Sequence, residues 1–137
     1  MSQLITSKEA RYKKNHAKMA TVIQFLKQEV YSDMPNLMLL LSYKDRAPLD
    51  RLLNKLISLE YIQKHVFEFQ TGKISIWGIT DLGLTQNIRD KSENFRTFKP
   101  NKVTAESLER KLVRQKKQIS LKKNVQTVLP NKAKVTT

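Results

Sequence analysis

The sequence predicts a mainly helical α+β domain with one small β-hairpin, followed by a basic C-terminal tail. Three observations lead to this fold class. Apolar residues recur at helical spacing as far as Glu60. After Tyr61 the chain is rich in aromatic and β-branched residues, which favour strands, on both sides of Thr71-Gly72. After Glu109 there is no acidic residue, but nine Lys or Arg residues follow.

The distribution of charge divides the 137 residues into three parts. The formal net charge is +14, from 26 basic and 12 acidic side chains. Residues 1–89 contain 13 basic and 8 acidic side chains, whereas residues 90–137 contain 13 basic and 4 acidic ones. We therefore expect a folded domain at 1–89 and a linker at 90–103. Residues 104–137 are expected to form a basic tail, helical at first and then disordered.

The first two helices are predicted from their caps. Thr6 followed by Glu9 has the spacing of a capping box, so a helix should begin there. Its basic first turns indicate either a solvated surface or an arm that contacts DNA phosphates. Ser32 or Asp33 can cap the second helix, with Pro35 in its first turn.

A third helix is predicted from about Pro48 to Glu60, with leucines on one side. Its other side is polar, and Arg and Asn side chains can form paired hydrogen bonds with guanine and adenine in the major groove. Two basic residues just before the helix are placed to contact phosphates. The candidate DNA-binding residues here are Lys44, Arg46, Asp50, Arg51, Asn54, Lys55 and Ser58. Taken alone, the pattern equally fits an ordinary amphipathic helix.

Residues 61–70 and 74–79 predict the two strands of the hairpin, with Gly72 where a positive φ is needed. The aromatic residues and Ile79 are expected to pack inward. The polar candidates for contact with the phosphate backbone or minor groove are Lys64, Thr71 and Lys73. Thr80 then caps a short helical turn that ends near Gln86.

The segment RLLNKLISLEYIQKHVFEFQTGKISIWGITDLGLTQ resembles the recognition helix, wing and closing turn of MarR-like winged helix-turn-helix regulators. The resemblance implies that the third helix and the hairpin bind double-stranded DNA. The chain departs from the family at Glu60-Tyr61, where many members carry glycine. The stretch from Ile5 to Gln86 is also similar to the N-terminal DNA-binding domain of plasmid mobilisation relaxases of the replication-relaxation type. Those proteins continue into a catalytic domain, for which 137 residues leave no room.

The tail is predicted to begin as a helix capped by Thr104. Gln115 interrupts any heptad pattern, which argues against a coiled coil. Basic side chains would coat this helix, and we expect them to contact DNA without sequence preference. A purely solubilising tail is the alternative. The candidate residues are Arg110, Lys111, Arg114, Lys116 and Lys117.

Catalytic, metal-binding and membrane functions find little support in the sequence. Cysteine is absent, and neither His16 nor His65 has a companion at ligand spacing. The three glycines form no phosphate-binding loop. No apolar run approaches the roughly 20 residues that span a bilayer, and the N-terminus lacks a signal-peptide pattern. We therefore expect a cytoplasmic protein that is not an enzyme and uses no cofactor, metal or membrane partner.

Two functions remain open at this stage. One is a transcriptional regulator, which a plasmid could encode. The other is a non-catalytic DNA-binding accessory protein of plasmid mobilisation, within a relaxosome, or of replication. Both require double-stranded DNA as a partner. A second copy in a homodimer, and a relaxase or replication protein, are further candidate partners.

Overall fold

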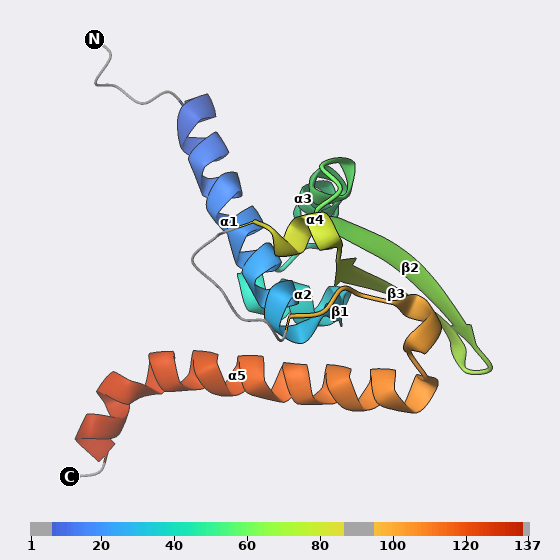
Figure 1. The fold of residues 1–137 in the computed structure, drawn as a ribbon. Coiled ribbons are helices and arrows are strands. Elements are labelled where there is room, and N and C mark those ends of the chain that lie inside the picture. The colour runs from blue at the N-terminus through green and yellow to red at the C-terminus, as the bar shows by residue number, and fades with distance from the viewer. Residues whose placement is uncertain (1–6, 87–94, 136–137) are drawn as a thin grey trace.

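The computed structural model describes residues 7–86 and 95–135, with side chains from residue 15 to residue 123. It is rich in helix and has one small antiparallel sheet, which confirms the predicted α+β class (Figure 1). The elements are α1 (Ser7–Glu29), β1 (Tyr31–Asp33), α2 (Met34–Leu41), α3 (Arg46–Ser58), β2 (Ile62–Phe69), β3 (Gly72–Ile79), α4 (Asp81–Leu84), the 3-10 helix η1 (Pro100–Lys102) and α5 (Ala105–Val135).

The caps decide where the short helices begin. Asp33 is the N-cap of α2, and its carboxylate accepts a hydrogen bond of 3.0 Å from the backbone N–H of Asn36. Thr80 caps α4 in the same way, because its hydroxyl accepts from the N–H of Gly83 at 3.0 Å. These two caps are confirmed, whereas Thr6, the predicted cap of the first helix, lies outside the described residues.

The third helix is shifted from its predicted position by two residues at each end. It begins at Arg46 rather than Pro48 and ends at Ser58 rather than Glu60. Proline is still tolerated, because Pro48 lies in the first turn, where backbone N–H groups have no partner within the helix. As a result, Arg46 is the first helical residue and not part of the preceding turn.

The α3 C-terminus has a geometry that usually requires glycine. Glu60 adopts a left-handed conformation, with a φ of 64°. The N–H of Glu60 donates to the carbonyl of Ile57 at 2.9 Å, and the N–H of Tyr61 donates to the carbonyl of Leu56 at 3.1 Å. This is the Schellman arrangement, which turns the chain from the helix into the first strand of the hairpin.

The sheet has three strands in the order β1-β3-β2, one more than the sequence predicted. β1 pairs antiparallel with β3, placing Tyr31 opposite Gly78. Three residues are too few to show the alternation that identifies a strand, and Ser32 and Asp33 are typical cap residues. The hairpin turn is as predicted, and Gly72 has a φ of 136°.

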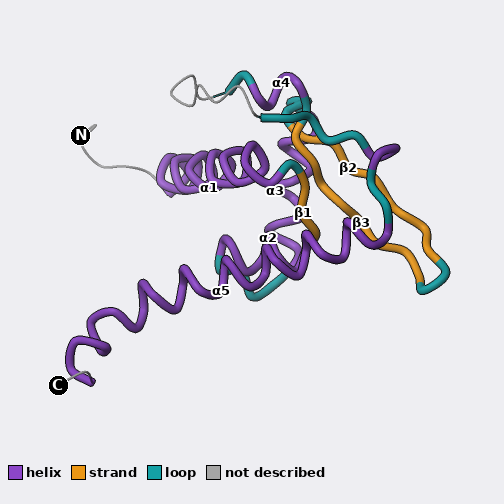
Figure 2. Tube along the Cα trace, turned by 60° about the horizontal axis from the view of Figure 1, so that its bottom comes forward, coloured by secondary structure: helices purple, strands orange, loops and turns teal. Residues whose placement is uncertain are grey.

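The sheet separates two hydrophobic clusters, because successive residues of β3 point to opposite faces. Trp77 and Ile79 pack with leucines of α3 and residues of α1 and α2. Ile76 packs on the other face, with Phe98 and residues of α5. α3 and α5 therefore lie on opposite sides of the sheet (Figures 1 and 2).

The segment expected to be a linker packs against the sheet where it is described. The ring of Phe98 is buried, and its backbone N–H donates to the carbonyl of Ile79 at 2.9 Å. Gly78 makes room for this ring, because a Cβ there would lie 2.1 Å from a ring carbon of Phe98. The sequence interpretation missed this contact, since a single aromatic residue in a polar segment has no periodicity. Residues 87–94 lie outside the described residues.

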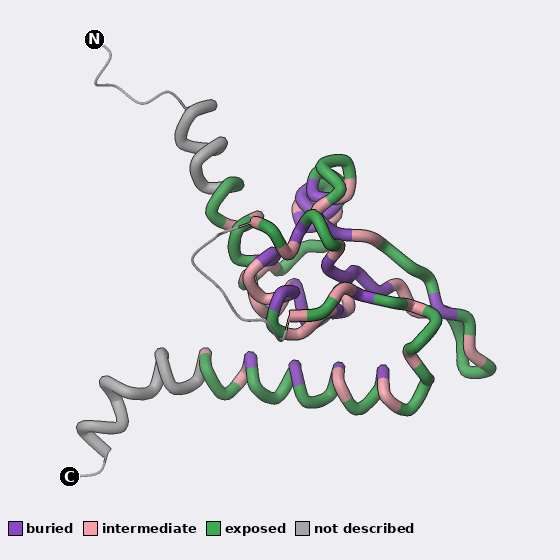
Figure 3. Tube along the Cα trace, in the orientation of Figure 1, coloured by how far each residue is buried: buried purple, intermediate pink, exposed green. Residues whose placement is uncertain are grey.

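The C-terminal helix is longer than predicted and packs on the domain. Thr104 caps it, accepting from the N–H of Ser107 at 3.1 Å. The helix continues to Val135, although the sequence predicted disorder in its last part. The last two residues of the chain lie outside the described residues. Among residues 105–123, one stripe faces the domain and the other residues are mostly exposed (Figure 3). The buried residues of this stripe are Leu108, Leu112, Gln115 and Ile119.

Candidate nucleic-acid interface

The outward face of α3 carries the polar residues that the sequence singled out. Four leucines at positions 49, 52, 53 and 56 fill the core. The opposite side exposes Arg51, Asn54 and Lys55 to solvent. Ser58 is also exposed, but its hydroxyl donates to the carbonyl of Lys55 at 2.6 Å and so caps the helix end. Arg51, Asn54 and Lys55 are thus the side chains of this face best placed to meet a ligand.

An ion pair occupies the start of this face. The Nε of Arg46 lies 3.2 Å from a carboxylate oxygen of Asp50, and both side chains are largely solvated. Such an exposed pair contributes little to stability. The pair does hold the Asp50 carboxylate against Arg46. In this structure Asp50, a candidate DNA-binding residue, is therefore the ion-pair partner of Arg46. Lys44 is exposed in the turn before α3.

A cleft of about 510 Å³ lies between α3 and α1. Arg51 and Lys55 line it from α3, and Asn15 and His16 line it from α1. The ammonium group of the nearby Lys18 lies 4.2 Å from the ring centroid of Tyr43, in the turn that joins α2 to α3. α1 therefore borders the exposed face of α3. The sequence left open whether the basic first turns of this helix form a solvated surface or an arm that contacts DNA phosphates.

Two lysines of the hairpin lie on the α3 side of the sheet. Lys64 and Lys73 follow the same alternation as Ile62 and Trp77, which pack with the helices. The ammonium group of Lys64 lies 5.3 Å from the ring centroid of Trp77. Lys73 forms an exposed ion pair with Glu68 at 3.3 Å. Thr71 is exposed in the turn between the strands.

The basic residues of α5 lie on the other side of the sheet, so the structure divides the predicted set into two groups. Lys111 is half-buried, and its ammonium group donates to the backbone carbonyl of Glu29 at 2.6 Å. It also lies 4.7 Å from the ring centroid of Tyr31. Burial lowers the pKa of Lys111, and the carboxylate of Glu29 opposes this effect. Lys111 thus attaches α5 to the end of α1.

Other tail residues divide in the same way. Arg114 forms an ion pair with Glu29 at 3.3 Å, and most of the Glu29 carboxylate is shielded from solvent. Arg110, Lys116 and Lys117 are exposed. The prediction treated all five basic residues alike. Composition alone does not show which cations are held by other groups of the protein and which are exposed to solvent.

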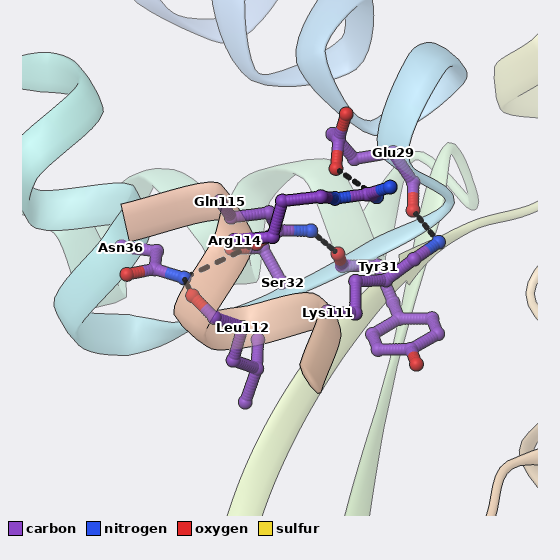
Figure 4. Close-up of polar contacts among 8 residues, drawn as sticks. All are labelled: Glu29, Tyr31, Ser32, Asn36, Lys111, Leu112, Arg114 and Gln115. Carbon is purple, nitrogen blue, oxygen red and sulfur yellow. Dashed lines mark hydrogen bonds and ion pairs between the residues drawn. The ribbon is translucent and has the colours of Figure 1, made fainter. Parts of the chain in front are cut away.

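Gln115 occupies the centre of a buried polar network that joins α5 to α2 and β1 (Figure 4). Its side-chain N–H donates to the carbonyl of Tyr31 at 2.6 Å. Its oxygen accepts from the hydroxyl of Ser32 at 2.8 Å and from the amide of Asn36 at 3.2 Å. Asn36 also donates to the carbonyl of Leu112 at 3.0 Å. The residue that argued against a coiled coil is therefore the anchor of the helix.

Among the described residues, no group of three or more His, Asp or Glu side chains could hold a metal ion. None of the helices in that part of the chain is both long and apolar enough to cross a bilayer. Comparison with protein-family models, with curated proteins and with solved structures gave no match. Functional inference therefore depends on the chain's own geometry.

Proposed function

We propose that this protein binds double-stranded DNA, with α3 in the major groove and the hairpin on the adjacent backbone. We further propose that it acts in the cytoplasm as a transcriptional regulator. The observation that carries this proposal is that exposed cations of α3 and of the hairpin belong to one side of the sheet. Lys55 on the helix and Lys64 and Lys73 on the strands all belong to the same side of the sheet.

The dimensions and chemistry of α3 support this arrangement. The major groove of B-form DNA, about 12 Å wide, admits one α-helix. Arg51 can form two hydrogen bonds with guanine, and Asn54 can form two with adenine. Both side chains are exposed and begin three positions apart, within one helical turn. Lys64 and Lys73 would then neutralise phosphates, which adds affinity without sequence preference.

The test begins with selection of preferred duplexes from a random library. Mobility-shift titrations then compare Arg51→Ala and Asn54→Ala on the selected duplex and on a scrambled one. Each substitution should weaken binding to the selected duplex by about 1–3 kcal/mol, with a smaller loss on the scrambled duplex. Lys122→Ala, which removes an exposed charge of α5 on the opposite side of the sheet, is the matched control and should leave both affinities unchanged. Equal losses on both duplexes would mean that Arg51 and Asn54 contact only phosphates.

Where the binding sites lie decides between regulation and an accessory role. Mapping the protein on its own genome or plasmid should place the sites in promoters. Sites at a transfer or replication origin would instead favour the mobilisation or replication role.

We also propose that the protein binds DNA without cutting it. A nicking tyrosine needs activation, and the charge on the transferring phosphate needs stabilisation, usually by a metal held in a ligand cluster. The ring of Tyr31 is buried against Phe98 and lies under Lys111, which supports a packing role. Supercoiled plasmid carrying the binding site, incubated with protein and Mg²⁺ or Mn²⁺, should stay supercoiled. Open-circle product that disappears on mutation of one tyrosine would contradict the proposal.

A further inference from the structure

A second basic surface lies on the α5 side of the sheet. One hollow of about 540 Å³ is lined by basic residues of the 95–103 segment and by Lys111. A smaller hollow of about 270 Å³ along α5 is also lined by Lys111, so the two hollows are neighbours. We call this region the rear basic surface, and its cations are Arg96, Lys99, Lys102, Arg110, Lys111 and Arg114.

The cations outnumber the acidic groups at this surface, which include the exposed Glu106 and Glu109 beside Arg110 on α5. Asp81 lines the larger hollow, where its carboxylate accepts a hydrogen bond from the neutral hydroxyl of Thr97 and keeps its negative charge. Glu29 is paired with Arg114. Within residues 7–86 and 95–135, no ion pair is seen for the four other exposed cations of this surface, which are Arg96, Lys99, Lys102 and Arg110. The rear basic surface therefore has a net positive charge that is open to solvent.

This surface and the exposed face of α3 cannot meet the same straight stretch of duplex. Phe98 and Leu108 belong to the two segments that form the rear basic surface. Both residues pack on the Ile76 side of the sheet. The leucines of α3 pack on the Trp77 side. Figure 1 shows α3 above the sheet and α5 running below it. A polyanion bound to the rear basic surface would therefore be a different stretch of chain or molecule from the duplex held by α3.

The chemistry favours a nucleic-acid backbone over a second copy of the chain. Two copies facing each other through this surface would bring cation against cation, which opposes association. A duplex strand presents a phosphate about every 3.4 Å along the axis. Four exposed cations of this surface, Arg96, Lys99, Lys102 and Arg110, have no ion pair among the described residues and are available to such phosphates.

We propose that the rear basic surface binds the phosphate backbone of a second DNA duplex, so that one protein molecule bridges two duplexes. This inference rests on the proposed function, because the first duplex is the one that α3 holds. The rear contact involves cations and phosphates alone, so it has no sequence preference and is sensitive to salt.

A capture experiment tests the bridge. The selected duplex is fixed to beads, protein is added, and retention of a labelled duplex of unrelated sequence is measured at low salt. Wild-type protein should retain the second duplex. Lys102→Glu/Arg110→Glu should reduce retention by about tenfold, because two phosphate contacts are replaced by repulsion. The same variant should bind the fixed duplex within about twofold of wild type, since α3 is unchanged.

The matched control is Lys116→Glu/Lys122→Glu, which reverses two exposed charges of α5 outside the rear basic surface. It should retain the second duplex like wild type. Wild-type protein that binds the beads but captures no second duplex would overturn the bridge and leave the proposed function intact. Equal capture by the Lys102→Glu/Arg110→Glu variant would also overturn it. Failure to bind either duplex would overturn the proposed function itself.

Discussion

α3 and α5 are both amphipathic helices with a basic exposed side, but they use their polar residues differently. The polar contacts seen on α3 stay within the helix, as in the Arg46–Asp50 pair. α5 directs Lys111, Arg114 and Gln115 into contacts with α1, β1 and α2. The comparison indicates that the net charge of a segment overstates the number of cations available to a polyanionic partner. Cations already held by a carbonyl or a shielded carboxylate have to be subtracted first.

The largest effect should come from removing the anchor of α5. Gln115→Ala deprives the carbonyl of Tyr31 of its donor and the hydroxyl of Ser32 of its acceptor. Buried polar groups without partners are costly, so we expect a loss of about 2–4 kcal/mol in the free energy of unfolding. Urea denaturation followed by circular dichroism measures this loss.

Gln118→Ala is the matched control, because Gln118 is exposed on the same helix. It should change the free energy of unfolding by less than about 0.5 kcal/mol. If the two variants were equally stable, α5 would not be part of the folded domain, and the contrast between the two helices would fail.

The sequence was sufficient for the elements that have strong local signals. Helical periodicity and caps such as Asp33 and Thr80 identified the short helices, and Gly72 identified the hairpin turn. The outward direction of Arg51 and Asn54 followed from the leucines on the opposite side of α3. These features depend on residues close together in the chain, so one segment is enough to predict them.

The features that were missed depend on residues far apart in the chain. β1 is defined by its pairing with β3, whose residues lie more than forty positions later. Phe98 fits over Gly78, and a glycine within a strand does not reveal which ring will cover it. Gln115 resembled an interruption, because its partners Ser32 and Asn36 come from the other end of the sequence. Local patterns carry no record of such long-range contacts.

A second prediction compares cations on the α3 side of the sheet with cations of α5, by their effect on the salt dependence of DNA affinity. Replacing Lys64 and Lys73 together by alanine should make the plot of log affinity against log salt less steep by about two, since each lost phosphate contact removes about 0.9. Lys116→Ala/Lys117→Ala removes two exposed charges from α5 and should leave the slope unchanged on a single short duplex. Mobility-shift titrations across a salt series measure both slopes. An equal flattening in the two variants would mean that the tail reaches the duplex held by α3.

A third prediction compares the caps of α2 and α3. Asp33 accepts a hydrogen bond from the N–H of Asn36, whereas Asp45, before α3, makes no side-chain cap hydrogen bond. Asp33→Ala should therefore cost about 1 kcal/mol of unfolding free energy, and Asp45→Ala should cost much less. Asp33→Asn should be close to wild type, because asparagine caps equally well. Thermal denaturation of the three variants would refute this reasoning if Asp45→Ala were the least stable.

The pH dependence of the same residue gives a further check. Burial raises the pKa of Asp33 above its ordinary value of 3.8. The folded protein then binds this proton more tightly than the unfolded chain does. The contribution of Asp33 to stability should consequently fall as pH rises from 3.8 through the raised pKa. Asp33→Asn should lack this decrease, which a comparison of unfolding free energies across that pH range would reveal.

The smallest effect should come from Glu60, where α3 turns into the hairpin. Its φ of 64° is disfavoured for a residue with a Cβ and costless for glycine. Glu60→Gly should therefore stabilise the protein by about 0.5 kcal/mol, after the greater freedom of glycine in the unfolded chain is taken into account. The substitution also removes a negative charge from the end of the helix proposed to enter the groove, so DNA affinity should rise.

Glu60→Ala separates the two causes, because it removes the charge but keeps the Cβ. It should raise DNA affinity as much as Glu60→Gly does, without any gain in stability. Thermal denaturation and mobility-shift titration of both variants provide the two measurements. A stability gain in both variants would show that the carboxylate, and not the left-handed backbone, is the unfavourable feature. An unchanged affinity in both would place Glu60 away from the phosphates, so the α3 C-terminus would not lie beside the DNA backbone.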